Sequence, residues 1–225
     1  YCFMQKEQFK KQKEAKKEDY LSSEEFNRVL KGEIVYPSSK AKVKRRVTLK
    51  NQINRITNTT GTEEGTLYNF EEYYCDVITI YARIAEGFED TAQALFAYLA
   101  KTGYGKRKSV GYGWLEMLAF EPFSGFPSPK DANAFVSLSN FVPAASDPAQ
   151  GYWKALVKYG KLGEEYASSA KPFKKPLLMF AAGSVFYDSP VRDHYGKLIA
   201  ELSPSHPKVV QYGFALPVPV KLSGG

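Results

Sequence analysis

The sequence predicts an α+β fold, and three observations indicate it. Residues 67–86 are rich in aromatic and β-branched side chains, and the run Val77-Ile-Thr-Ile-Tyr81 is typical of a buried strand. Apolar residues between 90 and 102 recur at helical spacing. Residues 175–186 then combine a short apolar run with turn residues, which again indicates a strand. The sequence contains no run of about 18 apolar residues, so no helix that crosses a membrane is predicted.

The elements of the first half follow in order. Ser22-Ser-Glu-Glu25 is a capping box, which predicts a short helix that ends at Gly32. A second helix begins near Asp90, and Gly103 is placed to be the residue that follows its end. Residues 114–120 are expected to form the next strand. The order strand, helix, loop, strand predicts one βαβ-like half of a ferredoxin-type fold.

The C-terminal third predicts a second β-rich unit. Residues 175–180 and 183–186 are expected to form a strand and its turn. A late strand is expected over residues 209–220, and its two prolines place it at the edge of a sheet. Residues 151–169 are ambiguous, because apolar spacing favours a helix whereas two glycines oppose it.

The charge of the chain is concentrated near its start. The net charge is +7, and residues 1–50 hold 14 Lys and Arg against 7 Asp and Glu. Basic clusters lie at residues 6–17, 40–50 and 101–108. They favour nucleic acid over a membrane as the partner, since no strong apolar face accompanies them. Residues 36–50 are expected to form a loop or an exposed hairpin.

A glycine-rich run from Thr102 to Gly113 is the most informative motif. It holds four glycines around Lys106, Arg107 and Lys108 and contains no acid. Glycines let a ligand approach the main chain, exposed N–H groups form an anion site, and the cations suit phosphate oxygens. The spacing fits neither a Walker loop nor a dinucleotide-binding fingerprint. A polyanion ligand is therefore expected, and a solvated turn between helix and strand is the alternative.

The sequence resembles a known family at several places. Gly103-Tyr-Gly105-Lys-Arg-Lys-Ser109-Val-Gly111-Tyr-Gly113 resembles the G-rich loop of the RAMP superfamily of CRISPR proteins. Lys50-Asn-Gln-Ile-Asn-Arg-Ile-Thr57 is similar to a second family segment and departs from it at Lys50 and Asn54. Gly183-Ser-Val-Phe186 and Tyr212-Gly213 are similar to the closing hairpin and final strand of one subfamily, the fourth subunit of the type III-A (Csm) effector.

The resemblance implies both a fold and a function. It implies two ferredoxin-like (RRM-like) units at residues 1–121 and 122–225, with the first strand of the first unit expected before Tyr1. It implies a non-catalytic RNA-binding subunit of the effector, which acts in antiviral defence in the prokaryotic cytoplasm. Its partners would be the 5′ repeat-derived handle of the CRISPR RNA, the large polymerase-type subunit and a backbone subunit, and indirectly the target RNA. No cofactor, metal or membrane partner is expected.

The expected RNA-binding residues are polar, basic, aromatic or glycine, and they fall into two groups. Single-stranded RNA is bound through backbone contacts and through stacking of bases on aromatic side chains and arginines. Packing against the next strand is the alternative role for the two tyrosines. The residues are Lys44, Arg45, Arg46, Asn51, Asn54 and Arg55 in the first group, and Gly103, Tyr104, Gly105, Lys106, Arg107, Lys108, Ser109, Gly111, Tyr112 and Gly113 in the second.

Two other classes of function remain open. Some RAMP relatives are endoribonucleases that process precursor CRISPR RNA, which requires a positioned His, Tyr or Lys. Only His194 and His206 are available as histidines, and both are expected to be ordinary surface residues. No cluster of His, Cys and Asp has the spacing of metal ligands. The third class is an assembly protein whose basic face meets only acidic protein partners.

Overall fold

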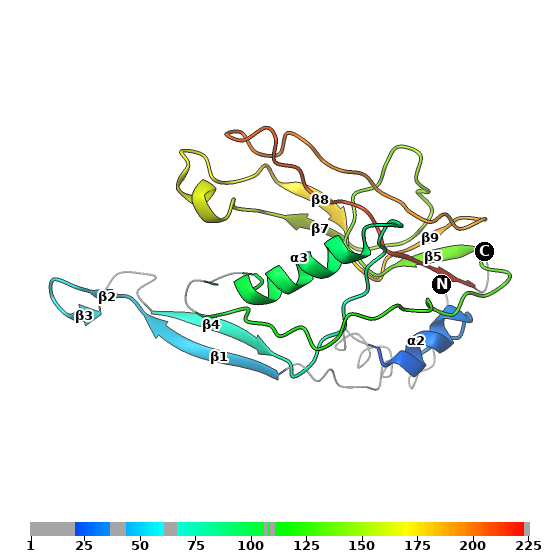
Figure 1. Ribbon diagram of the computed structural model, residues 1–225, viewed down its shortest axis with the longest axis horizontal. Helices are drawn as coiled ribbons and strands as arrows, with labels where there is room; N and C mark the ends of the chain where they lie inside the picture. Colours follow the sequence, from blue (N-terminus) through cyan, green and yellow to red (C-terminus); the bar gives the residue numbers. More distant parts are fainter. Residues whose placement is uncertain (1–20, 37–43, 61–66, 106–107, 109–110, 223–225) are drawn as a thin grey trace, which may run out of the picture. The chain divides into compact units, whose positions relative to one another are not determined.

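A computed structural model describes residues 21–36, 44–60, 67–105, 108 and 111–222. It confirms the α+β class, because the described residues combine α-helices with several antiparallel strand pairs (Figure 1). The chain divides into two compact units, unit 1 with Tyr1–Phe26 and Val35–Ile80, and unit 2 with Asn27–Ile34 and Tyr81–Gly225. The expected division after residue 121 stays a prediction. Among the described residues, no helix has both the length and the apolar character that a membrane crossing requires.

The helix α2 (Ser23–Leu30) begins at the predicted capping box. The Ser22 N–H donates to Glu25 Oε2 at 2.9 Å, and the Glu25 N–H donates to Ser22 Oγ at 3.1 Å. These two bonds satisfy backbone donors that the first turn of a helix leaves unpaired. The helix ends where predicted, since Gly32 has φ +87° and its N–H donates to the Val29 carbonyl oxygen.

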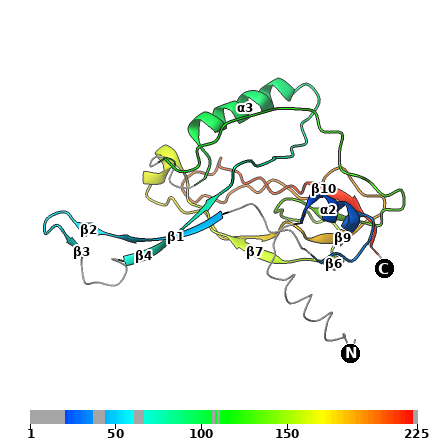
Figure 2. The same ribbon diagram turned by 90° about the horizontal axis from the view of Figure 1, so that it is seen from below.

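The strands of unit 1 form a narrow antiparallel β-ribbon, which we call the arm (Figures 1 and 2). Its strands are β1 (Lys44–Asn51), β2 (Ile53–Asn54), β3 (Thr59–Thr60) and β4 (Leu67–Tyr74). β1 pairs antiparallel with β4 over its whole length, and β2 pairs with β3 next to the turn. Of the two forms expected for residues 36–50, an exposed hairpin is therefore correct from Lys44 onward, and residues 37–43 lie outside the described residues.

In unit 2, the predicted second helix is α3 (Glu89–Thr102), and it ends at Gly103 with φ +79°. The strands expected on either side of it are wrong. Residues 77–81 and 114–120 run without a paired strand in the described structure. An apolar run becomes a strand only when its backbone N–H and C=O groups find a partner strand. The second segment instead contributes Phe120, whose ring lies 6.1 Å from that of Phe96 on α3.

The main sheet of unit 2 has the order β10-β5-β9-β6 and is antiparallel throughout. Its strands are β5 (Ala134–Ser137), β6 (Gly151–Tyr152), β9 (Val185–Tyr187) and β10 (Pro217–Val220). The proline-containing strand lies at an edge, as predicted. It is shorter than expected, because residues 209–216 form only single bridges, such as those that join Ile199 to Gln211 and Gly196 to Phe214.

The core of unit 2 lies against this sheet. Phe135, Phe141, Phe186 and Tyr195 are almost completely buried and pack together. The rings of Phe135 and Tyr195 stack with their centroids 3.8 Å apart. Aromatic side chains of this size bury much apolar area, so this cluster is the main hydrophobic contribution to the stability of the unit.

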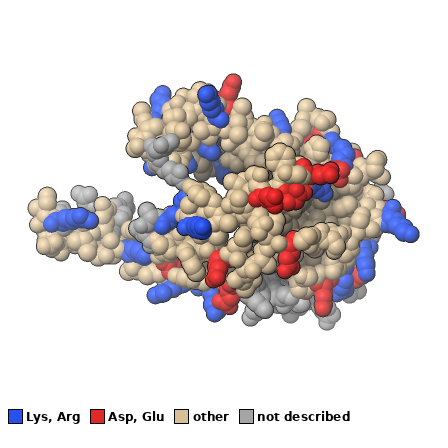
Figure 3. All heavy atoms as spheres, viewed as in Figure 1, with Lys and Arg blue, Asp and Glu red and all other residues tan. Residues whose placement is uncertain are grey.

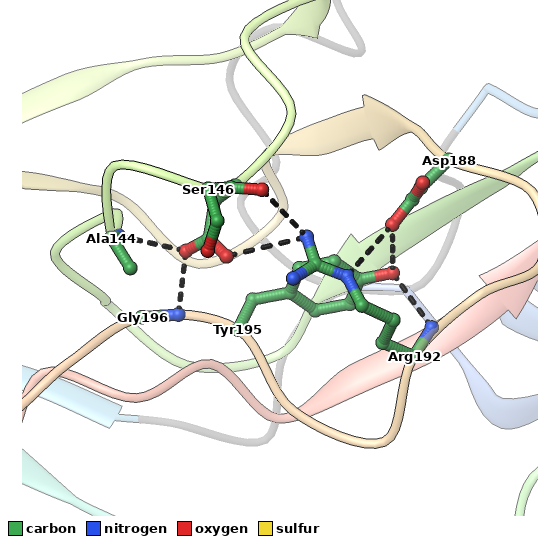
Figure 4. Close-up of polar contacts among 7 residues, drawn as sticks. Ala144, Ser146, Asp188, Arg192, Tyr195 and Gly196 are labelled. Carbon is green, nitrogen blue, oxygen red and sulfur yellow. Dashed lines mark hydrogen bonds and ion pairs between the residues drawn. The ribbon is translucent and has the colours of Figure 1, made fainter.

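A polar network ties two loops of unit 2 together beside the core (Figure 4). Asp147 accepts hydrogen bonds from the Ala144 and Gly196 N–H groups at 2.8 and 2.7 Å. The Arg192 guanidinium bridges Asp147 at 3.3 Å and Asp188 at 3.1 Å. The Tyr195 hydroxyl donates to Asp188 at 2.8 Å, and burial raises the pKa of Tyr195 to about 12. The partners of these groups all lie within the network or the adjoining backbone, which indicates a structural role.

A second strand pair of unit 2 occupies the segment whose structure was ambiguous. β7 (Ala155–Lys158) pairs antiparallel with β8 (Leu177–Phe180), and the 3₁₀ helix η2 (Glu164–Ser168) lies between them in the chain. The helix favoured for residues 151–169 is therefore wrong, whereas the strand at 177–180 and the turn at Gly183 are confirmed. Leu156 lies opposite Met179 in the register, so long-range pairing outweighs local helical spacing.

Candidate nucleic-acid interface

The glycine loop has a closed base. The Tyr104 N–H donates to the Gly113 carbonyl oxygen at 2.8 Å, directly after the end of α3. Gly113 has φ +72°, and a Cβ built there would lie 1.8 Å from the Tyr104 carbonyl oxygen. Only glycine fits this position, because a side chain would collide with main-chain atoms that cannot move independently. The structure therefore brings the two ends of the predicted loop together.

The next two glycines differ from those at the base. Gly105 and Gly111 have φ of +91° and +88°, yet a Cβ at either position would have no atom within 4 Å. Their positive φ explains why glycine is preferred, and no neighbour covers these positions in the described structure. Both glycines are exposed. The Gly111 N–H is already engaged, because it donates to the Lys108 carbonyl oxygen at 3.1 Å.

The side chains of the loop are only partly described. Lys106, Arg107 and Ser109 lie outside the described residues, whereas Lys108 is described and exposed. Tyr104 is 67% exposed and Tyr112 is half-buried. The exposed Tyr104 ring can stack on a base. Residues 114–120, the expected strand against which the tyrosines would alternatively pack, form no strand, and Tyr112 is half-buried without one.

One face of the arm is half-buried, and it carries cations at the end where β1 begins and β4 ends. Lys50 contacts Glu72 at 3.9 Å and lies over the Phe70 ring at 4.7 Å. Farther along the same strand and on the same face, Lys44 and Arg46 are exposed and make no ion pair with any described residue. These two predicted residues remain able to contact a phosphate.

The opposite face of the arm is exposed, and Arg45 is engaged there. Its guanidinium contacts Glu71 Oε1 at 2.5 Å, and the Tyr73 hydroxyl donates to Glu71 Oε2 at 3.0 Å. These hydrogen bonds, the one from Arg45 first, lower the pKa of Glu71. The pair therefore persists until the pH falls through that lowered pKa. Of the three adjacent cations in β1, Arg45 alone is held by a described carboxylate.

The remaining predicted residues of the arm lie towards its tip. Asn51 Nδ2 donates to Thr60 Oγ1 at 3.0 Å, so this amide joins the two sides of the arm. Asn54 pairs with Thr59 through the backbone at the end of β2. Arg55 occupies the turn that follows and is exposed. Basic and acidic side chains are interspersed on the face seen in Figure 3, so no single broad area of positive charge marks the interface there.

The arm and the glycine loop belong to different units, and each group of predicted residues is assembled within its own unit. Local signals in the sequence located both. Lys154 and Lys158, which lie next to Trp153 and Tyr159 in the sequence, were not among the predicted residues.

The two histidines lie in different surroundings. His194 is exposed, and its ring lies 6.4 Å from the Phe214 ring. His206 is half-buried beside the Tyr166 ring at 4.4 Å, and its Nε2 has no hydrogen-bond partner among the described residues. Within the described ranges, no three His, Cys, Asp or Glu side chains are grouped so that they could hold a metal ion.

Comparison of the sequence with protein-family models and with curated proteins gives no match.

Proposed function

We propose that this chain is a non-catalytic RNA-binding subunit of a type III-A CRISPR (Csm) effector and that it binds the 5′ repeat-derived handle of the CRISPR RNA. The observation that carries the proposal is the geometry of the glycine loop. Its base is closed by the hydrogen bond from Tyr104 to Gly113, and Gly105 and Gly111 are exposed with no described atom near the position of a Cβ. The segment between them holds Lys106, Arg107 and Lys108.

These features suit the phosphate backbone of RNA. A fixed base orients the loop before it binds, which reduces the entropy lost on association. The exposed main chain at Gly105 allows a phosphate to approach closely, and the adjacent cations add charge-assisted hydrogen bonds. A small ligand with one phosphate would need fewer cations, so an extended polyanion is the better fit.

The arm supports the same proposal. Lys44, Arg46 and Arg55 are exposed cations without an ion pair to a described residue, so they can neutralise phosphates. The opposite face exposes Val47, Leu49 and Leu67 as well, which suits contact with a protein neighbour. In this proposal the arm reaches RNA and an adjoining subunit together.

The finer parts of the proposal come from the resemblance in sequence. They are two ferredoxin-like units at residues 1–121 and 122–225, contacts with the large polymerase-type subunit and a backbone subunit, indirect contact with target RNA, and a cytoplasmic location in a prokaryote. The basic composition of the first 50 residues is compatible with a role inside a ribonucleoprotein.

Copurified nucleic acid tests the proposal. The tagged chain is expressed together with the other effector subunits and a CRISPR array, and the RNA that elutes with it is sequenced. We expect an RNase-sensitive absorbance at 260 nm and one fixed sequence at the 5′ end of the RNA. Elution of an assembled complex without RNA, or with RNA of random 5′ sequence, would contradict the proposal.

The non-catalytic part of the proposal has its own test. In the double variant His194→Ala/His206→Ala, we expect guide maturation and target cleavage by the complex to be unchanged. Loss of guide maturation in a variant that still assembles would instead favour an endoribonuclease.

A further inference from the structure

A groove on unit 2, separate from the glycine loop, combines an apolar floor with one lysine and two tyrosines. It has a volume of about 560 Å³ and lies beside the β7–β8 pair. Leu156 of β7 lies opposite Met179 of β8 in the register, and Met179 is almost completely buried. These two side chains form the floor. We call this feature the β7–β8 groove; its lining is Asn140, Leu156, Val157, Lys158, Tyr159, Met179, Gln211 and Tyr212.

Two exposed tyrosines from segments far apart in the sequence line the groove. Tyr159 follows β7 and is 77% exposed, whereas Tyr212 belongs to the later segment and is 64% exposed. The Tyr212 ring is held edge-on against Phe214, with centroids 5.3 Å apart. Such a ring keeps a fixed orientation while much of its surface remains accessible, which is the property that a stacking platform requires.

The charge around the groove is positive. A second, smaller hollow shares Lys158 and Gln211 with the groove, and it adds Lys174 and Lys175 to the surface. Among the described residues, no acidic side chain lines either hollow. The three lysines make no ion pair with the described part of the chain. Residues 154–175 as a whole carry six lysines and two glutamates. An anionic ligand would therefore be attracted here.

The groove also offers hydrogen-bonding groups. Asn140 Oδ1 accepts a hydrogen bond from the Ala182 N–H at 2.8 Å, which fixes the amide and leaves its NH₂ group to donate outward. Gln211 Nε2 donates to the Tyr212 carbonyl oxygen at 3.1 Å, which leaves Gln211 Oε1 as an acceptor. One fixed donor and one fixed acceptor match the edge of a nucleobase.

We infer that the β7–β8 groove is a second binding surface for single-stranded RNA, in which bases stack on Tyr159 and Tyr212 and phosphates contact Lys158, Lys174 and Lys175. The aromatic platforms, the positive charge and the amide groups together favour this ligand over an acidic peptide, which would not use two stacking rings. The inference rests on the proposed RNA-binding function and extends it to a surface that the glycine loop does not include.

The test measures binding of the full chain to a fluorescent 15-nucleotide oligo(U). In Tyr159→Ala/Tyr212→Ala we expect a loss of at least about tenfold in affinity, since stacking on one aromatic ring typically contributes this much. The double variant Tyr159→Phe/Tyr212→Phe keeps both rings and should bind like the unmodified chain. The matched control is Tyr98→Ala/Tyr152→Ala, which removes two equally exposed tyrosines that line neither hollow.

A second readout does not depend on the folding of any variant. Oligo(U) that contains 4-thiouridine is cross-linked to the unmodified chain by light, and the attachment sites are mapped by mass spectrometry. Cross-links at Tyr159 or Tyr212 would support the inference. Cross-links confined to the glycine loop, with full affinity in the tyrosine-to-alanine variant, would overturn the groove and leave the proposed function standing. No binding of the unmodified chain to oligo(U) would overturn both. A label bound in the groove could be displaced by polyglutamate and not by oligo(U). That result would assign the groove to an acidic peptide.

Discussion

The main sheet of unit 2 and the arm of unit 1 are both antiparallel, but they use their side chains differently. Around the sheet, Phe135 and Tyr195 stack in the core, and Arg192 is bonded to Asp147 and Asp188. The arm is two-stranded and exposes Leu49 and Tyr73 on one face. An isolated pair of strands is only marginally stable in water. The sheet therefore satisfies its own groups, whereas the arm presents groups that a partner can satisfy.

The largest expected effect separates the two regions by stability. Phe135→Ala removes a completely buried ring and should lower the free energy of unfolding by about 3–5 kcal/mol. Tyr73→Ala on the arm should change it by about 0.5 kcal/mol or less, because exposed positions contribute little. Denaturant unfolding followed by circular dichroism measures both. A loss for Tyr73→Ala as large as that for Phe135→Ala would mean that the arm is packed like a core.

A smaller effect is expected from one hydroxyl group of the sheet region. Tyr195→Phe removes one of the hydrogen bonds that Asp188 accepts and takes away the acceptor of the Arg192 backbone N–H, so it should cost about 1–3 kcal/mol of unfolding free energy. The matched control is Tyr98→Phe, which alters an exposed tyrosine. Wild-type stability in Tyr195→Phe would show that water replaces the lost bonds.

The Tyr195 hydroxyl group also predicts that the stability of the folded chain depends on pH. The pKa of Tyr195 is about 12 in the folded chain against an ordinary value of 10. Its stabilising contribution is thus complete below pH 10, and it is lost as the pH rises from 10 towards 12, because the unfolded chain loses this proton first. Thermal unfolding measures this effect. The midpoint temperature should fall more between pH 9 and pH 11 for the wild type than for Tyr195→Phe. An equal fall in midpoint temperature would contradict this role of the hydroxyl group.

The smallest expected effect concerns the arm and RNA. Glu71→Gln removes the carboxylate that holds Arg45, and it also makes the net charge more positive by one. RNA affinity should rise slightly, and the salt dependence should steepen by about 0.7 if Arg45 gains one phosphate contact. Glu121→Gln, which removes an exposed acid outside the arm, is the control for net charge. An equal rise in both variants would mean that Arg45 does not reach RNA.

Local rules predicted those elements that depend on neighbouring residues. The capping box at Ser22, the end of α3 at Gly103 and the edge position of the strand with Pro217 all follow from short-range geometry. The two closing glycines of the loop were likewise placed by spacing alone, and their contact confirms that the motif forms a loop.

Long-range pairing was not predictable in the same way. Residues 77–81 and 114–120 have the composition of strands, but composition does not supply a partner strand. Residues 151–169 contain apolar spacing that suits a helix, and pairing with β8 decides against it. The network around Arg192 joins residues more than 40 positions apart, so no local pattern announces it. The pairing of Arg45 with Glu71 was hidden for the same reason.

The central claim is that the glycine loop binds the handle of the CRISPR RNA through its phosphates. The most direct test is the salt dependence of handle binding by the assembled effector with Lys106→Glu/Arg107→Glu/Lys108→Glu in this subunit. Lys130→Glu/Lys197→Glu/Lys208→Glu makes the same change in net charge at exposed lysines outside the basic clusters and is the control. We predict weaker binding and a salt slope reduced by about 2 in the loop variant, since three phosphate contacts are lost. Unchanged affinity and slope in the loop variant would contradict the claim and leave the loop a purely structural turn.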